Sequence, residues 1–232
     1  AFSLLPFPDA LPVVVQRLLA EGLGTCLLLA TIVGSGIMGD ALANGQPGAA
    51  LLPHAIAIGA MLFVLITLFG PVSGAHFNPA VTMVFAIRRD LPAADAFAYV
   101  IVQIGAAMLG VWLAHLMFDL DVLQVSERVR TGPGQWTAEV VATAGLVFVI
   151  FAGLRVAPHL IAVMVGLYIM AALWFTASTS FANPAVTIAR SLTATFSGIQ
   201  PADVIPFLAS QILGALLGWQ LASLVYLGHP KA

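Results

Sequence analysis

The stretch GAHFNPAVTM at residues 74–83 returns as TSFANPAVTI at residues 179–188, and both copies contain Asn-Pro-Ala-Val-Thr. Asn is a favoured N-cap of α-helices, and Pro is favoured at the first helical position because its missing N–H has no partner to lose there. The pairs Asn78-Pro79 and Asn183-Pro184 therefore each predict the start of a helix.

Both predicted helices are too short to cross a membrane. The first apolar run ends at about Ile87, and the second ends at about Phe196. At 1.5 Å per residue, such helices reach roughly halfway through a hydrocarbon core of about 30 Å. Irregular backbone at that depth is tolerated only inside protein or beside water. The preceding loops, VSGAH at 72–76 and TASTSF at 176–181, are therefore expected to re-enter the membrane and line a pore.

The composition of the whole chain points to a membrane protein. Of its 232 residues, 61% are hydrophobic and 8% are charged, with a mean hydropathy of +1.05, whereas soluble domains carry about a quarter charged residues. Six apolar runs have the roughly 20 residues that a membrane-spanning helix needs: 13–38, 50–70, 96–118, 137–156, 159–177 and 204–227. We predict an all-α membrane protein, and the net charge of −2 gives no argument for nucleic acid.

The two copies of the motif belong to a larger internal repeat. Residues 201–224 resemble residues 93–116 at a constant offset of 108. AEGLGT at 20–25 also resembles AEVVAT at 138–143. Three features that recur in the same order indicate two homologous halves.

These halves predict one channel-like domain, 1–232, with repeats at about 13–118 and 136–227. Each half has three spans, and an odd number places the halves upside down relative to each other. An inverted repeat brings equivalent parts together at the middle of the membrane, which is where a transport path belongs.

The meeting point of the half-helices has a specific chemistry. Each helix would turn the positive end of its dipole toward the midplane. Each Asn can cap its helix with the carboxamide oxygen and keep its NH₂ donors for the lumen. A solute that offers oxygen to both donors interrupts any continuous chain of hydrogen-bonded water, and the positive helix ends repel cations. The pattern predicts a pore for neutral hydroxylated solutes.

These segments together resemble the major intrinsic protein family, the aquaporins and aquaglyceroporins. The resemblance covers essentially the whole chain, through AEGLGT at 20–25, SGAHFNPAVT at 73–82, the second Asn-Pro-Ala and the Gln-containing segments 103–110 and 211–218. It implies an aquaporin-like fold of six transmembrane helices plus two re-entrant half-helices, with one pore per subunit and a homotetramer. The pore motifs are then Asn78, Pro79 and Ala80 with Asn183, Pro184 and Ala185.

Three titratable residues fall within or beside this predicted pore. Glu21 and Glu139 lie inside spans, where a carboxylate suggests function by default, for example as a proton relay. Their symmetric placement favours the alternative, which the resemblance also implies, that each accepts hydrogen bonds from a re-entrant loop. His76 matches a family histidine near the inner part of the pore. It is expected to bond a loop carbonyl or to gate by protonation, and plain packing is the favoured alternative.

The residues of the narrowest point depart from the family pattern. The resemblance carries four positions over by their spacing from the Asn-Pro-Ala motifs: Ile58, Ala171, Ser180 and Val186. Val186 stands where the family has an arginine, so the sequence predicts an arginine-free selectivity filter. Arg190 follows one turn later on the same helix face. It either points toward the outer mouth, or it snorkels to the membrane interface or pairs with a loop carboxylate instead.

This filter lacks bulk and charge, so we expect a wide, mostly apolar pore. The solutes that suit it are water, glycerol-like polyols, urea-like amides and neutral metalloid hydroxides such as arsenite and methylated arsenicals. The segment NPAVTIARSLTATFSGI at 183–199 resembles a bacterial aquaporin-like subgroup associated with arsenic resistance, which favours the metalloid acids.

Other functions remain as alternatives. An ordinary water-selective aquaporin is the first of them. A secondary transporter would need coupling-ion carboxylates in the lumen. An enzyme would need a nucleophile with a base or a metal cluster, and the sequence offers neither. We expect no enzyme activity, no cofactor and no metal site.

The expected surroundings are a lipid bilayer, and the Lys and Arg residues of the loops predict the orientation in it. With both termini in the cytoplasm, five basic residues lie inside and three outside: Arg17, Arg88, Arg89, Arg155 and Lys231 against Arg128, Arg130 and Arg190. We predict a multi-pass protein of the bacterial inner membrane with cytoplasmic termini.

Overall fold

The computed structural model describes residues 11–43 and 46–227, so Lys231 lies outside the described residues. The described helices are α1 (Val13–Leu42), α2 (Pro47–Ser73), α3 (Pro79–Ile87), α4 (Ala93–Met117), α5 (Pro133–Val156), the 3₁₀ turn η1 (Pro158–Leu160), α6 (Ile161–Phe175), α7 (Pro184–Arg190) and α8 (Pro201–Val225). Six helical stretches of the described chain are long and apolar enough to cross a membrane: α1, α2, α4, α5, η1 with α6, and α8. The all-α prediction with six spans is confirmed.

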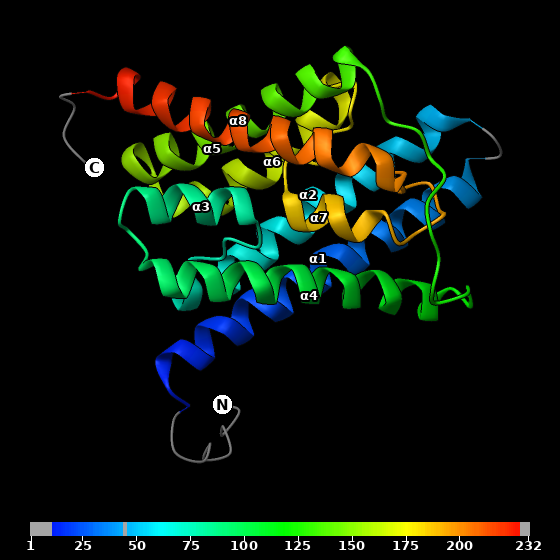
Figure 1. Cartoon of the computed structure of the whole chain (residues 1–232), viewed down its shortest axis with the longest axis horizontal. Coiled ribbons are helices and arrows are strands. Elements are labelled where there is room, and N and C mark those ends of the chain that lie inside the picture. The colour runs from blue at the N-terminus through cyan, green and yellow to red at the C-terminus, as the bar shows by residue number, and fades with distance from the viewer. Residues whose placement is uncertain (1–10, 44–45, 228–232) are drawn as a thin grey trace.

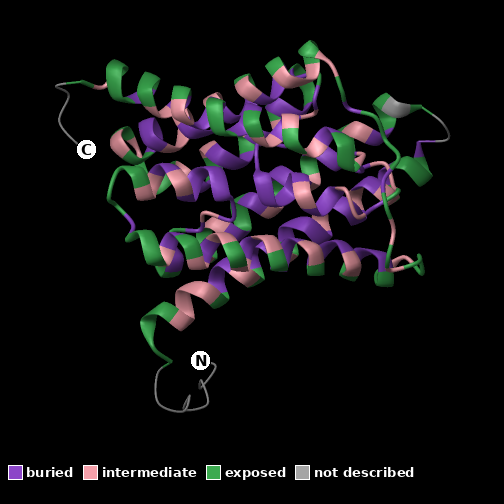
Figure 2. Ribbon diagram, viewed as in Figure 1, coloured by how far each residue is buried: buried purple, intermediate pink, exposed green. Residues whose placement is uncertain are grey.

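The long helices surround the two short ones (Figure 1). Helices α3 and α7 lie end to end through the middle of the bundle. One end of the molecule holds the start of α1, the C-terminal end of α8 and the turn after α3. The connection 118–132 lies at the other end. The inward faces of the helices are buried, whereas the perimeter is exposed (Figure 2). Large apolar side chains, among them Phe97 and Ile205, are exposed on that perimeter, where a bilayer would cover them.

Glycines at equivalent positions bring the long helices of each half into close contact. A Cβ atom at Gly110 of α4 would clash with the backbone carbonyl oxygen of Cys26 on α1. In the other half, a Cβ atom at Gly218 of α8 would clash with the carbonyl oxygen of Ala144 on α5. Small residues allow helix backbones to approach closely in membranes. These glycines therefore pack helices within the chain.

The first half-helix has the predicted extent, and the second is shorter. α3 ends at Ile87, as the sequence indicates, but α7 ends at Arg190 rather than at about Phe196. The Ser191 hydroxyl donates to the carbonyl oxygen of Ile188 at 2.7 Å, and Ser and Thr side chains compete in this way with helical hydrogen bonds. The segment 191–200 instead pairs with the connection 118–132, for example through Ser126 N–H to the Ser191 carbonyl at 2.9 Å.

Candidate pore

The two motif asparagines cap their half-helices as predicted. Asn78 Oδ1 accepts a hydrogen bond from Ala80 N–H at 2.9 Å. Asn183 Oδ1 accepts from Ala185 N–H at 3.0 Å and from Val186 N–H at 3.3 Å. Both asparagines are buried, and each is followed by Pro at the first helical position. The local sequence therefore fixes where both half-helices begin.

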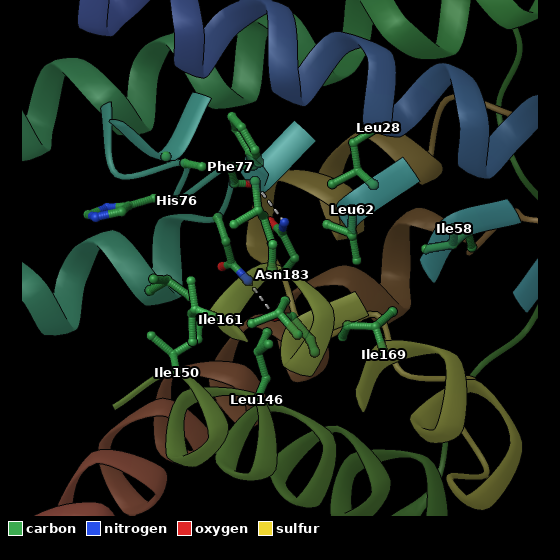
Figure 3. Close-up of a pocket in the computed structure, with 18 of the residues that line it drawn as sticks. Leu28, Ile58, Leu62, His76, Phe77, Leu146, Ile150, Ile161, Ile169 and Asn183 are labelled. Atoms are coloured by element: carbon green, nitrogen blue, oxygen red, sulfur yellow. Dashed lines mark hydrogen bonds between the residues drawn. The ribbon is translucent and has the colours of Figure 1, made fainter. Parts of the chain in front are cut away.

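Each asparagine also bonds the opposite loop. Asn78 Nδ2 donates to the Ala182 carbonyl oxygen at 2.7 Å. Asn183 Nδ2 donates to the Phe77 carbonyl oxygen at 2.7 Å, as Figure 3 shows. A carboxamide has two N–H donors, so one N–H of each asparagine remains for a solute. The expectation that both donors face the lumen is corrected to one.

The loops before the asparagines share an unusual backbone. Ala75 and Phe77 have φ values of +50° and +47°, and at equivalent places in the second loop Ser180 and Ala182 have +47° and +48°. A residue with a side chain in this left-handed region is strained by roughly 1–3 kcal/mol and persists only where surrounding contacts fix it. Both loops therefore need strong partners for their N–H groups.

Glu21 is that partner in the first loop. Its Oε1 accepts from His76 N–H at 2.9 Å and from the Ser73 hydroxyl at 2.7 Å. Its Oε2 accepts from Phe77 N–H at 2.7 Å and from Gln103 Nε2 at 2.8 Å. The carboxylate is fully buried and is not among the described residues that line the cavity.

Glu139 has the same position in the second half. Its two oxygens accept from Phe181 N–H and Ala182 N–H, both at 2.9 Å. Gln211 Nε2 donates to it at 2.6 Å and also to the Thr187 hydroxyl at 2.7 Å. These are the bonds of a loop anchor, the alternative that the sequence favoured over a proton relay.

A cavity of about 530 Å³ runs along the two loops and between the long helices (Figure 3). One end lies at the turn between α5 and α6, beside Pro158 and His159, and the other lies beside Leu173 and Arg190. We call the latter the Arg190 end. The wall of the whole cavity is mainly aliphatic and includes Leu28, Leu62, Leu146, Ile150, Ile161 and Ile169. Polar groups are concentrated on the loops and half-helices, so the path is apolar on one side and polar on the other.

Three of the four predicted filter residues line this cavity. Ile58, Ser180 and Val186 do so, but Ala171 is exposed and is absent from the lining. Helix α6 instead presents Ile169 and Leu173, which are four residues apart and share one face. Spacing counted back from Asn183 crosses an irregular loop, and such a loop does not preserve the rotational position of the helix before it. The assignment of Ala171 was wrong.

Arg190 lines the cavity, so the arginine-free expectation holds at position 186 but fails for the cavity as a whole. Its side chain is 3% exposed. Its Nε donates to the Ser197 carbonyl oxygen, and its guanidinium lies 3.4 Å from the centre of the Phe181 ring. Neither Nη atom has a hydrogen-bond partner within the described chain. Of the two alternatives, Arg190 takes the pore-facing one.

His76 also lines the cavity, between the Asn pair and the end that lies beside Pro158 and His159. Its Nδ1 lies 3.1 Å from the Thr82 hydroxyl, so its polar partner is a side chain and not the expected loop carbonyl. Its ring packs 4.5 Å from that of Phe85 and 5.6 Å from that of Tyr99, centre to centre. The contacts agree with the packing alternative.

Sequence reasoning missed Phe181 and Leu173 as lining residues. Phe181 stands two residues before Asn183, at the place that His76 has before Asn78, and this equivalence is the only signal that could have indicated it. Within residues 11–43 and 46–227, no three His, Cys, Asp or Glu side chains converge as metal ligands would.

One family model and three known proteins are similar to this chain. Residues 11–171 match the family model described as Major intrinsic protein. The chain is similar to "Aquaglyceroporin AqpS" of Rhizobium meliloti (strain 1021), with 56% identity over 201 residues that cover 87% of this chain and 86% of the relative. It is also similar to "Nodulin-26" of Glycine max, with 34% identity over 58% of this chain and 49% of the relative. Among solved structures, the aquaglyceroporin from Plasmodium falciparum has the same fold, with a TM-score of 0.69 at 18% identity over 91% of this chain and 97% of that chain.

Proposed function

The chain belongs to the major intrinsic protein family, and from this premise we propose that its pore passes glycerol-like polyols and neutral metalloid hydroxides, including arsenite and methylated arsenicals, as well as water. Membership of the family makes it a passive channel for small solutes in a membrane and not an enzyme. Which solutes the channel passes depends on the geometry of its own pore.

The observation that carries the proposal is the mixed wall of the Arg190 end. Ile58, Val186 and Leu173 contribute aliphatic surface there, while Ser180 and Arg190 contribute polar groups. The Ser180 hydroxyl is buried without a hydrogen-bond partner in the described chain. A buried unpaired polar group costs about 1–3 kcal/mol, which a hydroxylated solute would recover.

A polyol matches such a wall because its carbon atoms lie along one side and its hydroxyl groups along the other. A metalloid hydroxide presents several hydroxyl groups, and a methylated arsenical adds apolar surface. The cavity volume of about 530 Å³ falls in the range of roughly 300–1,000 Å³ that is common for small-molecule sites. The resemblance to a protein named as an aquaglyceroporin, over most of both chains, supports the same solute class.

A water-selective aquaporin is the second candidate, and the pore-facing Arg190 is the observation that favours it. An arginine at the narrowest point adds bulk and fixed donors, which favour water over larger solutes. The aliphatic residues around it weigh against this alternative, because Ile58 and Val186 offer no donors to a file of water molecules.

Swelling and shrinkage of liposomes that carry the purified protein distinguish the two candidates. Glycerol, urea, arsenite and a methylated arsenical are each imposed as an osmotic gradient. We expect non-saturable flux of water and of the larger solutes, with a low activation energy and no dependence on sodium or proton gradients. Water flux without glycerol or arsenite flux would refute the proposed range, and uphill accumulation would refute a channel.

The assembly and orientation also remain proposals. We propose a homotetramer, as the resemblance implies, in the bacterial inner membrane with both termini in the cytoplasm. Native mass spectrometry in lipid-like detergent would check the subunit number. Protease access to tags at the two termini in sealed vesicles would check the orientation.

A further inference from the structure

The connection 118–132 crosses the end of the molecule at which α7 terminates, and it carries Arg130. This connection is firmly attached to the segment that follows α7. Gln200 N–H donates to the Arg128 carbonyl at 2.8 Å, and Arg130 N–H donates to the Asp203 carboxylate at 2.6 Å. Arg130 itself is 8% exposed, so a residue outside every helix is buried in the protein.

The guanidinium of Arg130 bonds two carbonyl groups that support the pore. Its Nε donates to the Gly198 carbonyl oxygen at 2.8 Å, and its Nη1 donates to the Ser178 carbonyl oxygen at 3.2 Å. Ser178 directly precedes the strained part of the second re-entrant loop, which starts at Thr179, and it stands two residues before the cavity-lining Ser180. Arg130 therefore fixes that loop from the side opposite the cavity.

Both buried arginines of this end contact the same aromatic ring. The Arg130 guanidinium lies 4.8 Å from the centre of the Phe181 ring, and that of Arg190 lies 3.4 Å from it. Phe181 and Arg190 line the cavity, whereas Arg130 does not. Any influence of Arg130 on a solute must therefore pass through Phe181 and the loop that carries it.

The charge of Arg130 is not used in an ion pair. The ion pairs of the described chain are Arg17–Asp95 and Arg88–Asp90. Burial, and next the nearby charge of Arg128, lower the pKa of Arg130 to about 10, so the side chain still carries its charge at neutral pH. That charge is directed at carbonyl oxygens and at the face of Phe181, both of which attract cations.

We propose that Arg130 is a positioning residue that sets the selectivity of the pore by holding Phe181 and the second re-entrant loop against Arg190. The proposal rests on the channel function proposed above. Without Arg130, the Phe181 ring loses one of its two cationic neighbours, and the Ser178 carbonyl loses a donor. The ring and Arg190 then become free to retreat from the path, and the Arg190 end widens.

The test is the ratio of glycerol flux to water flux through Arg130→Gln in liposomes. Both fluxes are measured in the same vesicles, so the ratio does not depend on how much protein is folded. We expect the ratio to rise about 2- to 30-fold, the range given by loss of one cation–π contact from a permeation barrier. A merely structural role would lower both fluxes in proportion and leave the ratio unchanged, which would overturn the proposal.

The matched control is Arg128→Gln. Arg128 lies on the same connection and makes the same kinds of contact, with a hydrogen bond to the Phe196 carbonyl at 2.6 Å and its guanidinium 4.9 Å from the Phe196 ring centre. Neither Arg128 nor Phe196 lines the cavity, so we expect the ratio to stay at its wild-type value. An equal rise in Arg128→Gln would overturn the proposal, because the loss of any positive charge on this connection would then explain the effect.

Two further variants keep the inference testable if Arg130→Gln fails to fold. Arg130→Lys keeps the charge but cannot bond both carbonyls in a fixed fork, and it should raise the ratio less. In a Phe181→Leu background, Arg130 substitutions should no longer change the ratio. An unchanged ratio in every folded Arg130 variant overturns the proposal for Arg130 and leaves the proposed channel function intact. If the wild type passes water but no glycerol, the proposed solute range fails, while Arg130→Gln should still begin to admit glycerol.

Discussion

Replacing Glu21 with Gln tests whether the buried carboxylate holds the first re-entrant loop. Each of its oxygens accepts two hydrogen bonds, from the Ser73 hydroxyl and His76 N–H on one and from Phe77 N–H and Gln103 Nε2 on the other. An amide NH₂ in place of either oxygen faces two donors and loses both bonds. At about 1.5–3 kcal/mol for a hydrogen bond to a charged group, the loss is about 3–6 kcal/mol.

That loss is a large part of the roughly 5–15 kcal/mol by which folded proteins are stable. We therefore expect Glu21→Gln to give little folded protein and a strongly lowered midpoint of thermal unfolding in detergent. Asp95→Asn is the control, because Asp95 pairs with Arg17 at 3.2 Å while both side chains remain about a quarter exposed, at 28% and 25%. Such a pair contributes about 0–1 kcal/mol.

Two results would refute this reasoning. The first is a Glu21→Gln midpoint that falls no further than that of Asp95→Asn. The second is full expression of Glu21→Gln together with loss of pH-dependent transport, since that is the behaviour of a proton relay. Flux per folded channel, measured on the surviving protein, should otherwise be close to wild type.

Five other substitutions test the pore itself. Asn183→Asp should abolish solute flux or admit cations, because it removes the donor to the opposite loop and adds a negative charge at two positive helix ends; unchanged flux and proton exclusion in liposomes would contradict this. Val186→Arg should lower glycerol flux about tenfold or more and water flux much less, whereas Arg190→Ala should broaden the solute range, as the same swelling assay measures. Leu173→Trp should block glycerol, whereas Ala171→Trp should leave glycerol flux within about twofold, since only Leu173 of these two lines the cavity. Equal effects of the two substitutions would support the filter position that spacing assigned to Ala171.

The sequence predicted most of the fold because its strongest signals are local. A capping Asn followed by Pro determines the start of a helix within three residues, and this signal occurs twice, at Asn78 and Asn183. Apolar runs of membrane length are equally local. The C-terminal end of α7 was misplaced because apolar residues continue to Phe196, while the serine and threonine side chains between them favour other backbone conformations.

The site was predicted less completely because its remaining parts depend on tertiary contacts. Which residue of α6 faces the cavity depends on how the helix is rotated in the bundle, and spacing from Asn183 placed Ala171 there in error. Arg130 lies 51 positions before Phe181 on an irregular connection, so no local pattern indicates that they meet. Arg190 was left between two alternatives that only its place in the folded chain, in the cavity wall and against Phe181, could separate.

The reciprocal hydrogen bonds between the two re-entrant loops have a consequence for biosynthesis. Asn78 needs the carbonyl of Ala182, and the carbonyl of Phe77 needs Asn183. While the ribosome has made only the first repeat, its loop therefore has a donor and an acceptor at membrane depth without their partners. The amino-terminal repeat must wait for the second loop to be translated and inserted, so the pore matures in one late step, and a chain that stops before residue 183 lacks the partners of these two polar groups.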